Sequence, residues 1–283
     1  MQHPQRADIL QKYAHRLAPN VLWLLDQPHL EQRTPAWFEA RTRRVTASEV
    51  GTILRVSDAF TRPVPLFYQK VTGDYFPGHK PGAFAQQAMD RGTRLEAEAV
   101  RHFLAVTGLE TVLDFGLISH PEHWFVAASP DGVLIDGSLL EIKCPTTYTE
   151  ELKPPKKQYW CQMQWQMETC NAEQCYFFQY FPEGTEFVNS YRKREKLTET
   201  KHHLQIISRD RVWFQSVFSD VENFMNDVLA CQEDRENART LGPYFSGVEK
   251  IQLQDALFGD VFGEVQPIIP TFVSKETRPV FRK

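Results

Sequence analysis

The sequence predicts an α/β fold with a central mixed β-sheet flanked by helices. Helical segments come first, then a compact set of strands, then a helix and further strands, an order that also occurs in α+β proteins. Hydrophobic residues make up 42% of the 283 residues and aromatic residues 12%, which is enough for a sizeable core. Asp136-Gly137 is a strong turn signal between two apolar runs and predicts a hairpin in the sheet.

Charge and composition exclude several classes of protein. Acidic residues outnumber basic ones by 36 to 32, which argues against a basic exterior for general nucleic-acid binding but leaves a local basic groove open. No apolar run approaches the ~18 residues of a membrane span, and the first residues do not resemble a signal peptide. The five cysteines have neither a disulfide-framework spacing nor the close pairs of an iron–sulfur site. We therefore expect an intracellular protein, in the cytoplasm or nucleus, that is neither secreted nor in a membrane.

The N-terminal part begins with helical patterns. Apolar spacing predicts a helix over 5–26, which Gln27-Pro28 ends. A short helix should follow from Thr34-Pro35, because threonine can cap and proline is favoured at the first helical position. Thr46 and Glu49 have the spacing of a capping box and predict a helix over 47–54.

The start of the helix over 47–54 is a candidate anion site. Arg41, Arg43 and Arg44 precede it and Ser48 lies in its first turn. Free backbone N–H groups at a helix N-terminus attract anions, and arginines strengthen that attraction. An ordinary capped helix with solvated arginines explains the same pattern, so the spacing alone does not decide.

The helix predicted over 83–106 has one charged residue on an otherwise apolar or glycine face. That face comprises Met89, Gly92, Glu96, Ala99 and Phe103. Burying a lone carboxylate is costly, so Glu96 should be paired, neutralised or bound to a metal. The alternative is that Glu96 lies at the edge of the face and reaches water or a neighbouring arginine.

The remaining elements follow from apolar runs and breakers. Further helices are predicted over 158–168 and 209–239, and the sequence Leu241-Gly242-Pro243 ends the second. Strands are predicted over 115–119, 124–128, 133–135, 139–143, 175–180, 186–191 and 204–207. The residues after Pro243 have no clear pattern.

The hairpin register decides which side chains meet. A two-residue turn would place Asp131 on the sheet face opposite to Glu141 and Lys143. A three-residue loop, or a bulge near Gly132, places Asp131 on their face instead. Because Pro130 and Gly132 favour such a break, we predict the shifted register.

A cluster of Asp131, Glu141 and Lys143 would have a clear chemical use. Carboxylates are hard ligands for Mg²⁺, and an ammonium group can orient an attacking water. Glu96 would add a second metal position, and two metals about 4 Å apart stabilise both oxygens of a phosphodiester displacement. A surface hairpin with an ordinary Glu–Lys pair is the alternative.

These residues lie in motifs that resemble a known family. Ser129-Pro130-Asp131 followed by Leu140-Glu141-Ile142-Lys143-Cys144-Pro145 resembles the PD-(D/E)xK nuclease signature, in the form found in lambda-exonuclease or YqaJ-type viral recombinases. Three more motifs resemble that family of alkaline exonucleases in the same order: Trp37 to Arg41 with Val45 to Val50, Gly92 to Glu96, and Tyr159 to Gln164. The resemblance implies a restriction-endonuclease-like nuclease core.

The resemblance also implies a role for each matching residue. Asp131, Glu141 and the backbone carbonyl of Ile142 would hold the principal Mg²⁺, and Glu96 would complete a second metal site. Mn²⁺ could substitute for either ion. Lys143 would activate or position the water, and Gln162 would support the water or its surroundings. The residues that would grip a 5′-phosphate are Arg41, Ser48 and Ser129.

The implied activity is 5′-to-3′ digestion of linear double-stranded DNA, releasing mononucleotides and leaving 3′ overhangs for single-strand annealing recombination. DNA ends and a single-strand annealing protein are the implied partners. The chain is longer at both ends than the compact phage form of this family, so both a homotrimer and a monomer remain open. We expect a helical arm over 1–30, a nuclease domain over 31–240 and a tail over 241–283.

Two alternatives remain open on the sequence alone. The same fold could act as an endonuclease or an RNase. In a different class, the chain could be a DNA-end-binding recombination factor without catalysis, although all the acids and the lysine are present.

Overall fold

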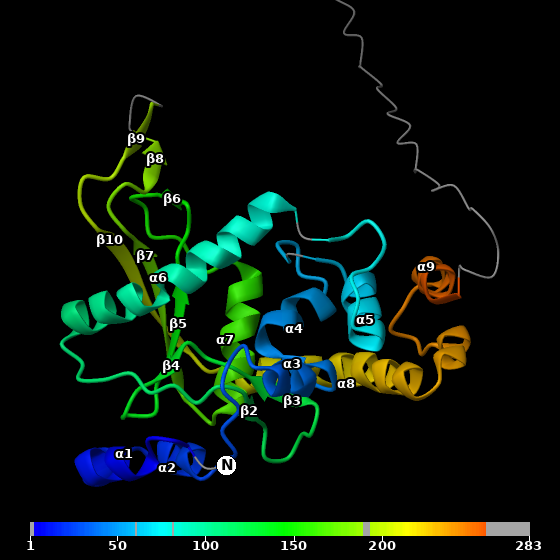
Figure 1. Cartoon of the computed structure of the whole chain (residues 1–283), viewed down its shortest axis with the longest axis horizontal. Helices are drawn as coiled ribbons and strands as arrows, with labels where there is room; N and C mark the ends of the chain where they lie inside the picture. The colour runs from blue at the N-terminus through cyan, green and yellow to red at the C-terminus, as the bar shows by residue number, and fades with distance from the viewer. Residues whose placement is uncertain (1–2, 60, 81, 189–192, 259–283) are drawn as a thin grey trace, which may run out of the picture.

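The computed structural model describes residues 3–59, 61–80, 82–188 and 193–258. In this part of the chain the predicted α/β architecture is confirmed (Figure 1). None of its helices has the length and apolar character needed to cross a membrane.

Helices begin and end the described chain, and the strands lie between them. The helices are α1 (Arg6–Tyr13), α2 (Pro19–Leu25), α3 (Pro35–Thr42), α4 (Ala47–Ile53), α5 (Pro63–Thr72), α6 (Ala83–Thr107), α7 (Lys157–Thr169), α8 (Arg211–Glu233) and α9 (Gly247–Phe258). The strands are β1 (Val45–Thr46), β2 (Ile118–Ser119), β3 (Val126–Ala128), β4 (Gly132–Val133), β5 (Leu139–Lys143), β6 (Thr147–Tyr148), β7 (Gln174–Phe181), β8 (Glu186–Val188), β9 (Arg194–Lys196) and β10 (Lys201–Ser208). Short 3-10 helices cover Ala14–Arg16 and Arg235–Thr240.

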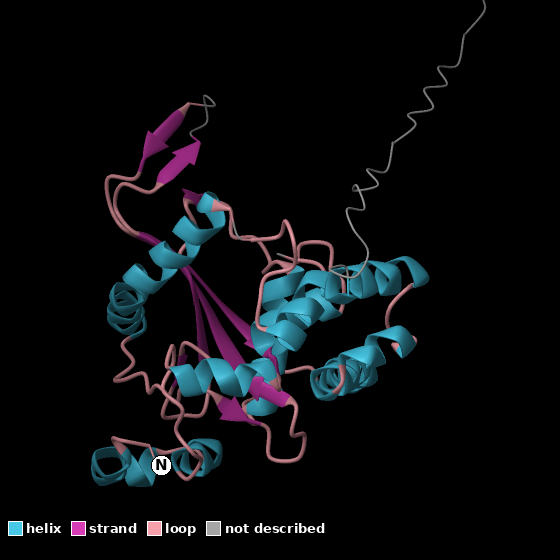
Figure 2. Cartoon of the chain, turned by 45° about the vertical axis from the view of Figure 1, so that its right-hand side comes forward, coloured by secondary structure: helices cyan, strands magenta, loops and turns pink. Residues whose placement is uncertain are grey.

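A four-stranded mixed sheet in the order β10-β7-β5-β4 forms the centre. β5 and β7 are parallel, while β10 and β4 run antiparallel to their neighbours. Helix α6 covers one face, where Ala99 and Phe103 pack on Leu140 and Phe178. Helix α7 covers the other face, so that helices lie on both sides of the sheet (Figure 2). Met163 of α7 belongs to the cluster of buried residues on that face. β5 therefore lies between two helices, and each face of it meets a different one.

The hairpin has the shifted register that the sequence predicted. Gly132 pairs with Leu140 and Val133 with Leu139. The loop holds three residues, since Leu134 N–H donates to the Ser138 carbonyl at 2.8 Å. Gly137 has a φ of +85°, which glycine adopts without strain. Continued by one residue, this register places Asp131 opposite Glu141.

A third cluster of buried residues lies between α4, α5 and α8. Phe67 of α5 packs edge-on against Phe224 of α8 with ring centroids 5.7 Å apart. Phe245, which follows α8 in the chain, closes on Phe67 at 5.0 Å, and Leu253 of α9 belongs to the same cluster. Residues 241–258 are thus packed against this core, whereas 259–283 lie outside the described residues.

Several sequence predictions need correction. The helix expected over 5–26 is two helices, because Ala18 is extended and Pro19 starts α2 afresh. The helix expected to reach residue 239 ends at Glu233 and continues as a 3-10 helix. Helices α5 and α9 and the short strands β1, β6 and β9 were not predicted from the sequence. These strands have two or three residues each, too few to show a period.

One half-buried histidine, His120, makes stability depend on pH. Nδ1 of His120 accepts hydrogen bonds from the backbone N–H groups of Glu122 and His123, at 3.1 and 3.2 Å. Burial lowers the pKa of His120 below its ordinary 6.5, and neighbouring His123 lowers it further. The folded protein thus favours the neutral ring, so its stabilising contribution is present above pH 6.5 and is lost as pH falls below that value.

We expect the unfolding temperature to fall between pH 7.5 and 5.5, and to fall less in His120→Asn. Asparagine keeps a side-chain acceptor for the same turn but takes up no proton in this range. Thermal unfolding followed by circular dichroism at both pH values tests this. An equal fall in the two proteins would contradict it.

Candidate active site

The side chain of Glu141 is the most deeply buried acid of the site. It lies on β5 beneath α7 and is 1% exposed. Oε1 accepts from Gln162 Nε2 and Oε2 from Gln166 Nε2, both at 2.7 Å. Lys143 Nζ lies 2.5 Å from Oε1. Both carboxylate oxygens therefore have donors, which is what a buried charge requires.

Asp131 lies beside Glu141 at the start of β4. Its Oδ2 accepts from the backbone N–H of Ile142 at 2.6 Å, which fastens it to β5. Burial raises the pKa of Asp131 well above its ordinary value, and the neighbouring Glu141 raises it further. Two acids this close together favour a cation between or beside them.

Lys143 supplies a positive charge next to the two acids. Besides Glu141, it lies 3.4 Å from Gln162 Oε1 and 4.7 Å from the centre of the Tyr159 ring. Burial alone would lower the pKa of Lys143, but the charges of Glu141 and Asp131 outweigh it and raise the pKa above its ordinary value. The side chain is therefore a protonated hydrogen-bond donor in this arrangement.

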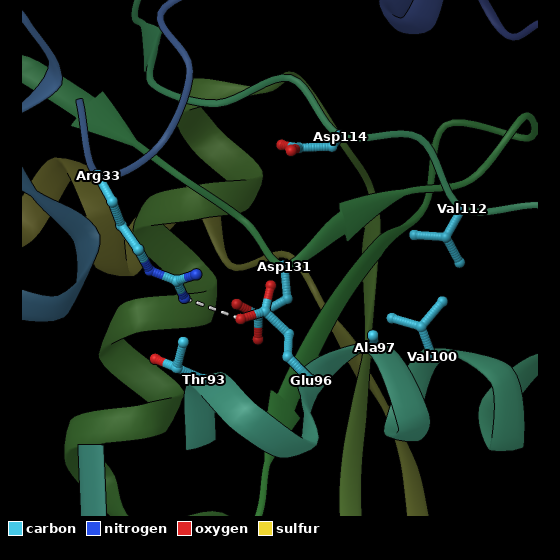
Figure 3. A pocket seen from close by; sticks show the side chains of 8 residues that line it. All are labelled: Arg33, Thr93, Glu96, Ala97, Val100, Val112, Asp114 and Asp131. Atoms are coloured by element: carbon cyan, nitrogen blue, oxygen red, sulfur yellow. Dashed lines mark hydrogen bonds and ion pairs between the residues drawn. The ribbon is translucent and has the colours of Figure 1, made fainter. Parts of the chain in front are cut away.

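Glu96 of α6 opens onto the same cavity as Asp131. The cavity has a volume of about 320 Å³, and Figure 3 shows the two carboxylates pointing toward each other across it. Glu96 pairs with Arg33 Nη2 at 2.9 Å and is 32% exposed in its side chain. The predicted buried face of α6 is wrong at Met89, which is 51% exposed, and Glu96 lies at the edge of the buried stripe.

The donor set fits a divalent cation of the hard type. Asp131 and Glu96 offer carboxylate oxygens to one cavity, and oxygen is the ligand atom that Mg²⁺ prefers. Among the described residues no three Asp, Glu, His or Cys side chains are grouped closely enough to make a metal site alone. Water and substrate oxygens would have to complete the coordination, which is usual for Mg²⁺.

The three residues predicted to bind a 5′-phosphate come from separate segments. Arg41, on α3, is half-buried with its guanidinium 4.2 Å from the centre of the Trp37 ring. Ser48 is exposed in the first turn of α4. Ser129 donates to the Gly116 carbonyl at 2.7 Å, two residues before Asp131. In the described part of the chain no direct contact joins these three side chains to one another, so their shared role remains a prediction, as does that of the Ile142 carbonyl.

The structure adds residues that the sequence analysis did not name. Gln166 follows Gln162 by one helical turn, and this i, i+4 spacing could have indicated that both face Glu141. Arg33 and Asp114 line the cavity from loops that carry no pattern.

A double-mutant cycle tests the contact between Gln166 and Glu141. Gln166→Met removes the donor to a buried carboxylate and should cost about 1.5–3 kcal/mol of unfolding free energy. In a Glu141→Gln background the same change should cost less, giving a coupling of about 0.5–3 kcal/mol. Chemical denaturation of the four proteins gives both values. Additive effects would show that the two side chains do not interact.

The chain is similar to proteins of one known family. A model of the YqaJ-like viral recombinase domain matches residues 36–173, a range that includes every site residue named above except Arg33. The crystal structure of an alkaline exonuclease (LHK-Exo) from Laribacter hongkongensis is 31% identical with a TM-score of 0.55, covering 74% of this chain and 100% of that one. The same enzyme in complex with dAMP gives 30% identity and a TM-score of 0.53, over 73% and 100%.

A curated viral protein is also similar. The uncharacterized protein R354 of Acanthamoeba polyphaga mimivirus is 25% identical over an alignment of 171 positions, which covers 54% of this chain but only 29% of that protein. The match thus spans less than a third of this larger relative. With the solved exonuclease matched over its whole length, the chain belongs to the family of YqaJ-like viral recombinases and alkaline exonucleases, which are hydrolytic nucleases.

Proposed function

We propose that the chain is a Mg²⁺-dependent exonuclease that digests linear double-stranded DNA from a 5′ end. It releases mononucleotides and leaves 3′ overhangs, which a single-strand annealing protein would use in recombination. The observation that carries the proposal is the meeting of Asp131, Glu141 and Lys143 beside a cavity that Glu96 also lines. Acids and an ammonium group so placed suit phosphodiester hydrolysis.

The chain's own residues would hold the reactants. Asp131 and Glu96, with the Ile142 carbonyl and Glu141, would bind the metal, which when bound polarises the phosphodiester and lowers the pKa of water. Lys143 is held by its ion pair with Glu141 and donates hydrogen bonds, so it would orient the attacking water and stabilise negative charge on the phosphate. Gln162 and Gln166 keep Glu141 in one orientation.

The residues proposed to recognise the DNA end are separate from the acids. Ser129 precedes Asp131 by two residues, so a phosphate held at Ser129, Arg41 and Ser48 would lie at a fixed distance from the metal ligands. Arginine suits a terminal phosphate because its guanidinium can donate two parallel hydrogen bonds. This arrangement supports cutting next to a 5′ end rather than within a duplex.

Removing one acid or the lysine should separate cleavage from binding. Asp131→Asn and Lys143→Met should each lower Mg²⁺-dependent DNA cleavage by about 10²-fold or more, since each takes away charge that acts on the transition state. Affinity for a 5′-phosphorylated duplex, measured by fluorescence anisotropy with EDTA present, should stay within about threefold of wild type, because each variant changes one charge and most of the affinity for a duplex comes from its many backbone phosphates. Full activity in either purified variant would refute the proposed site.

A panel of ends tests direction and substrate. Linear duplexes should be digested, faster with a 5′-phosphate than with a 5′-hydroxyl, while closed circular DNA and RNA should remain intact. Arg41→Ala should lower the ratio of the two linear rates by about tenfold or more, because a charge-assisted hydrogen bond contributes roughly 1.5–3 kcal/mol. Nicking of the circle would indicate an endonuclease, and cleavage of RNA would indicate an RNase. Binding of ends without any cleavage would indicate a non-catalytic recombination factor.

A further inference from the structure

A buried lysine lies outside the acid cluster and has no part in the chemistry above. Lys70 is on the last turns of α5, and its side chain is 4% exposed. Its Nζ lies 3.0 Å from Glu49 Oε2 and donates to the carbonyls of Arg41 at 3.0 Å and Arg44 at 2.7 Å. These three acceptors match the three hydrogen atoms of an ammonium group.

The three acceptors belong to the two segments that carry Arg41 and Ser48, two of the three residues proposed to bind the 5′-phosphate. The Arg41 carbonyl is at the C-terminal end of α3, and the Arg44 carbonyl lies in the turn that leads to β1. Glu49 is in the first turn of α4, where its Oε2 also accepts from the backbone N–H of Thr46 at 2.8 Å. The Lys70 ammonium therefore joins the end of one helix to the start of the next.

The backbone of Lys70 is in turn held by α8. Gln232 of α8 donates to the Lys70 carbonyl at 2.8 Å and lies 3.4 Å from the Thr42 carbonyl. α5 packs on α8 through Phe67 and Phe224. The ammonium thus has a fixed position relative to the core, and the turn over 41–49 is fixed by it.

Burying this charge has a cost that packing alone does not explain. Burial lowers the pKa of Lys70, and Glu49 only partly offsets the effect. A buried ion pair is often no more stabilising than apolar side chains of the same volume. A lysine retained here is better explained by the geometry that it imposes on the carbonyls of Arg41 and Arg44.

We propose that Lys70 is a positioning residue for 5′-phosphate recognition, because its ammonium sets the place of Arg41 relative to Ser48. The inference rests on the proposed function, in which these two side chains bind the terminal phosphate. Lys70 does not touch the phosphate. Without the three contacts of the Lys70 ammonium, the end of α3 is no longer connected to the start of α4. The position of the Arg41 side chain relative to Ser48 then varies.

The test compares rates on the same duplex with a 5′-phosphate and with a 5′-hydroxyl. The ratio of the two initial rates is measured on one preparation, so a partly unfolded fraction cancels. Lys70→Met should lower this ratio by about tenfold, since a displacement of about 1 Å in a positioned group can cost up to ~10²-fold. The rate on 5′-hydroxyl ends should change much less, and the loss on 5′-phosphate ends should be mainly a rise in KM.

Two further variants separate positioning from stability. Arg209→Met removes the cation of another buried pair, whose Nη2 lies 2.7 Å from Glu168, and should leave the ratio unchanged even if it lowers the unfolding temperature. Lys70→Met with Glu49→Gln removes both charges of the pair, avoids an unpaired buried carboxylate and should fold if the single variant does not. It should still have the lowered ratio, because the two carbonyls remain without their donor.

The outcomes are distinguishable. A wild-type ratio near one would overturn the proposed 5′-end function and this inference with it. A wild-type ratio well above one that stays unchanged in both Lys70 variants would overturn the inference alone. An equal loss of the ratio in Arg209→Met would show that general destabilisation, and not the position of Arg41, is responsible.

Discussion

The buried carboxylate of Glu141 is the constraint on which the site depends. A charge that is 1% exposed on a central strand is tolerated only where donors surround it, and here Lys143, Gln162 and Gln166 provide them. This requirement fixes the rotation of α7, since both glutamines must face the sheet. The same requirement explains why α7 has buried glutamines beside fully buried apolar residues such as Met163.

The second constraint is the register of one short hairpin. Asp131 meets Glu141 because the loop has three residues and not two, and a shift of one residue would send Asp131 to the other face of the sheet. Gly132 permits this approach, since a Cβ atom there would lie 2.0 Å from Val112 Cγ1. The position of the Asp131 carboxylate therefore depends on both the turn at Gly137 and the packing of Val112 against Gly132.

The local sequence predicts much of this and misses what depends on distant contacts. The hairpin register, the cap at Thr34 and the Thr46–Glu49 contact follow from residues within a few positions of one another, and the structure confirms them. The pairing of Arg33 with Glu96 joins residues 63 positions apart, and no pattern in either segment indicates it. Lys70 is similar: its helix was not predicted from the sequence, and only the folded chain shows that its ammonium is enclosed by the turn after α3.

Two short stretches of chain carry the acid Asp131 and the residues proposed to recognise a DNA end. Ser129 and Asp131 are on one of them, and the turn from Arg41 to Ser48 is the other, with Lys70 beneath it.

The central claim is that the acids bind a divalent metal, and Mn²⁺ titration followed by electron paramagnetic resonance of the free ion tests it most directly. We expect the wild-type chain to bind Mn²⁺ stoichiometrically and Asp131→Asn to lose most of that binding while keeping its fold. Equal binding by the two proteins, or no binding by the wild type, would contradict the account.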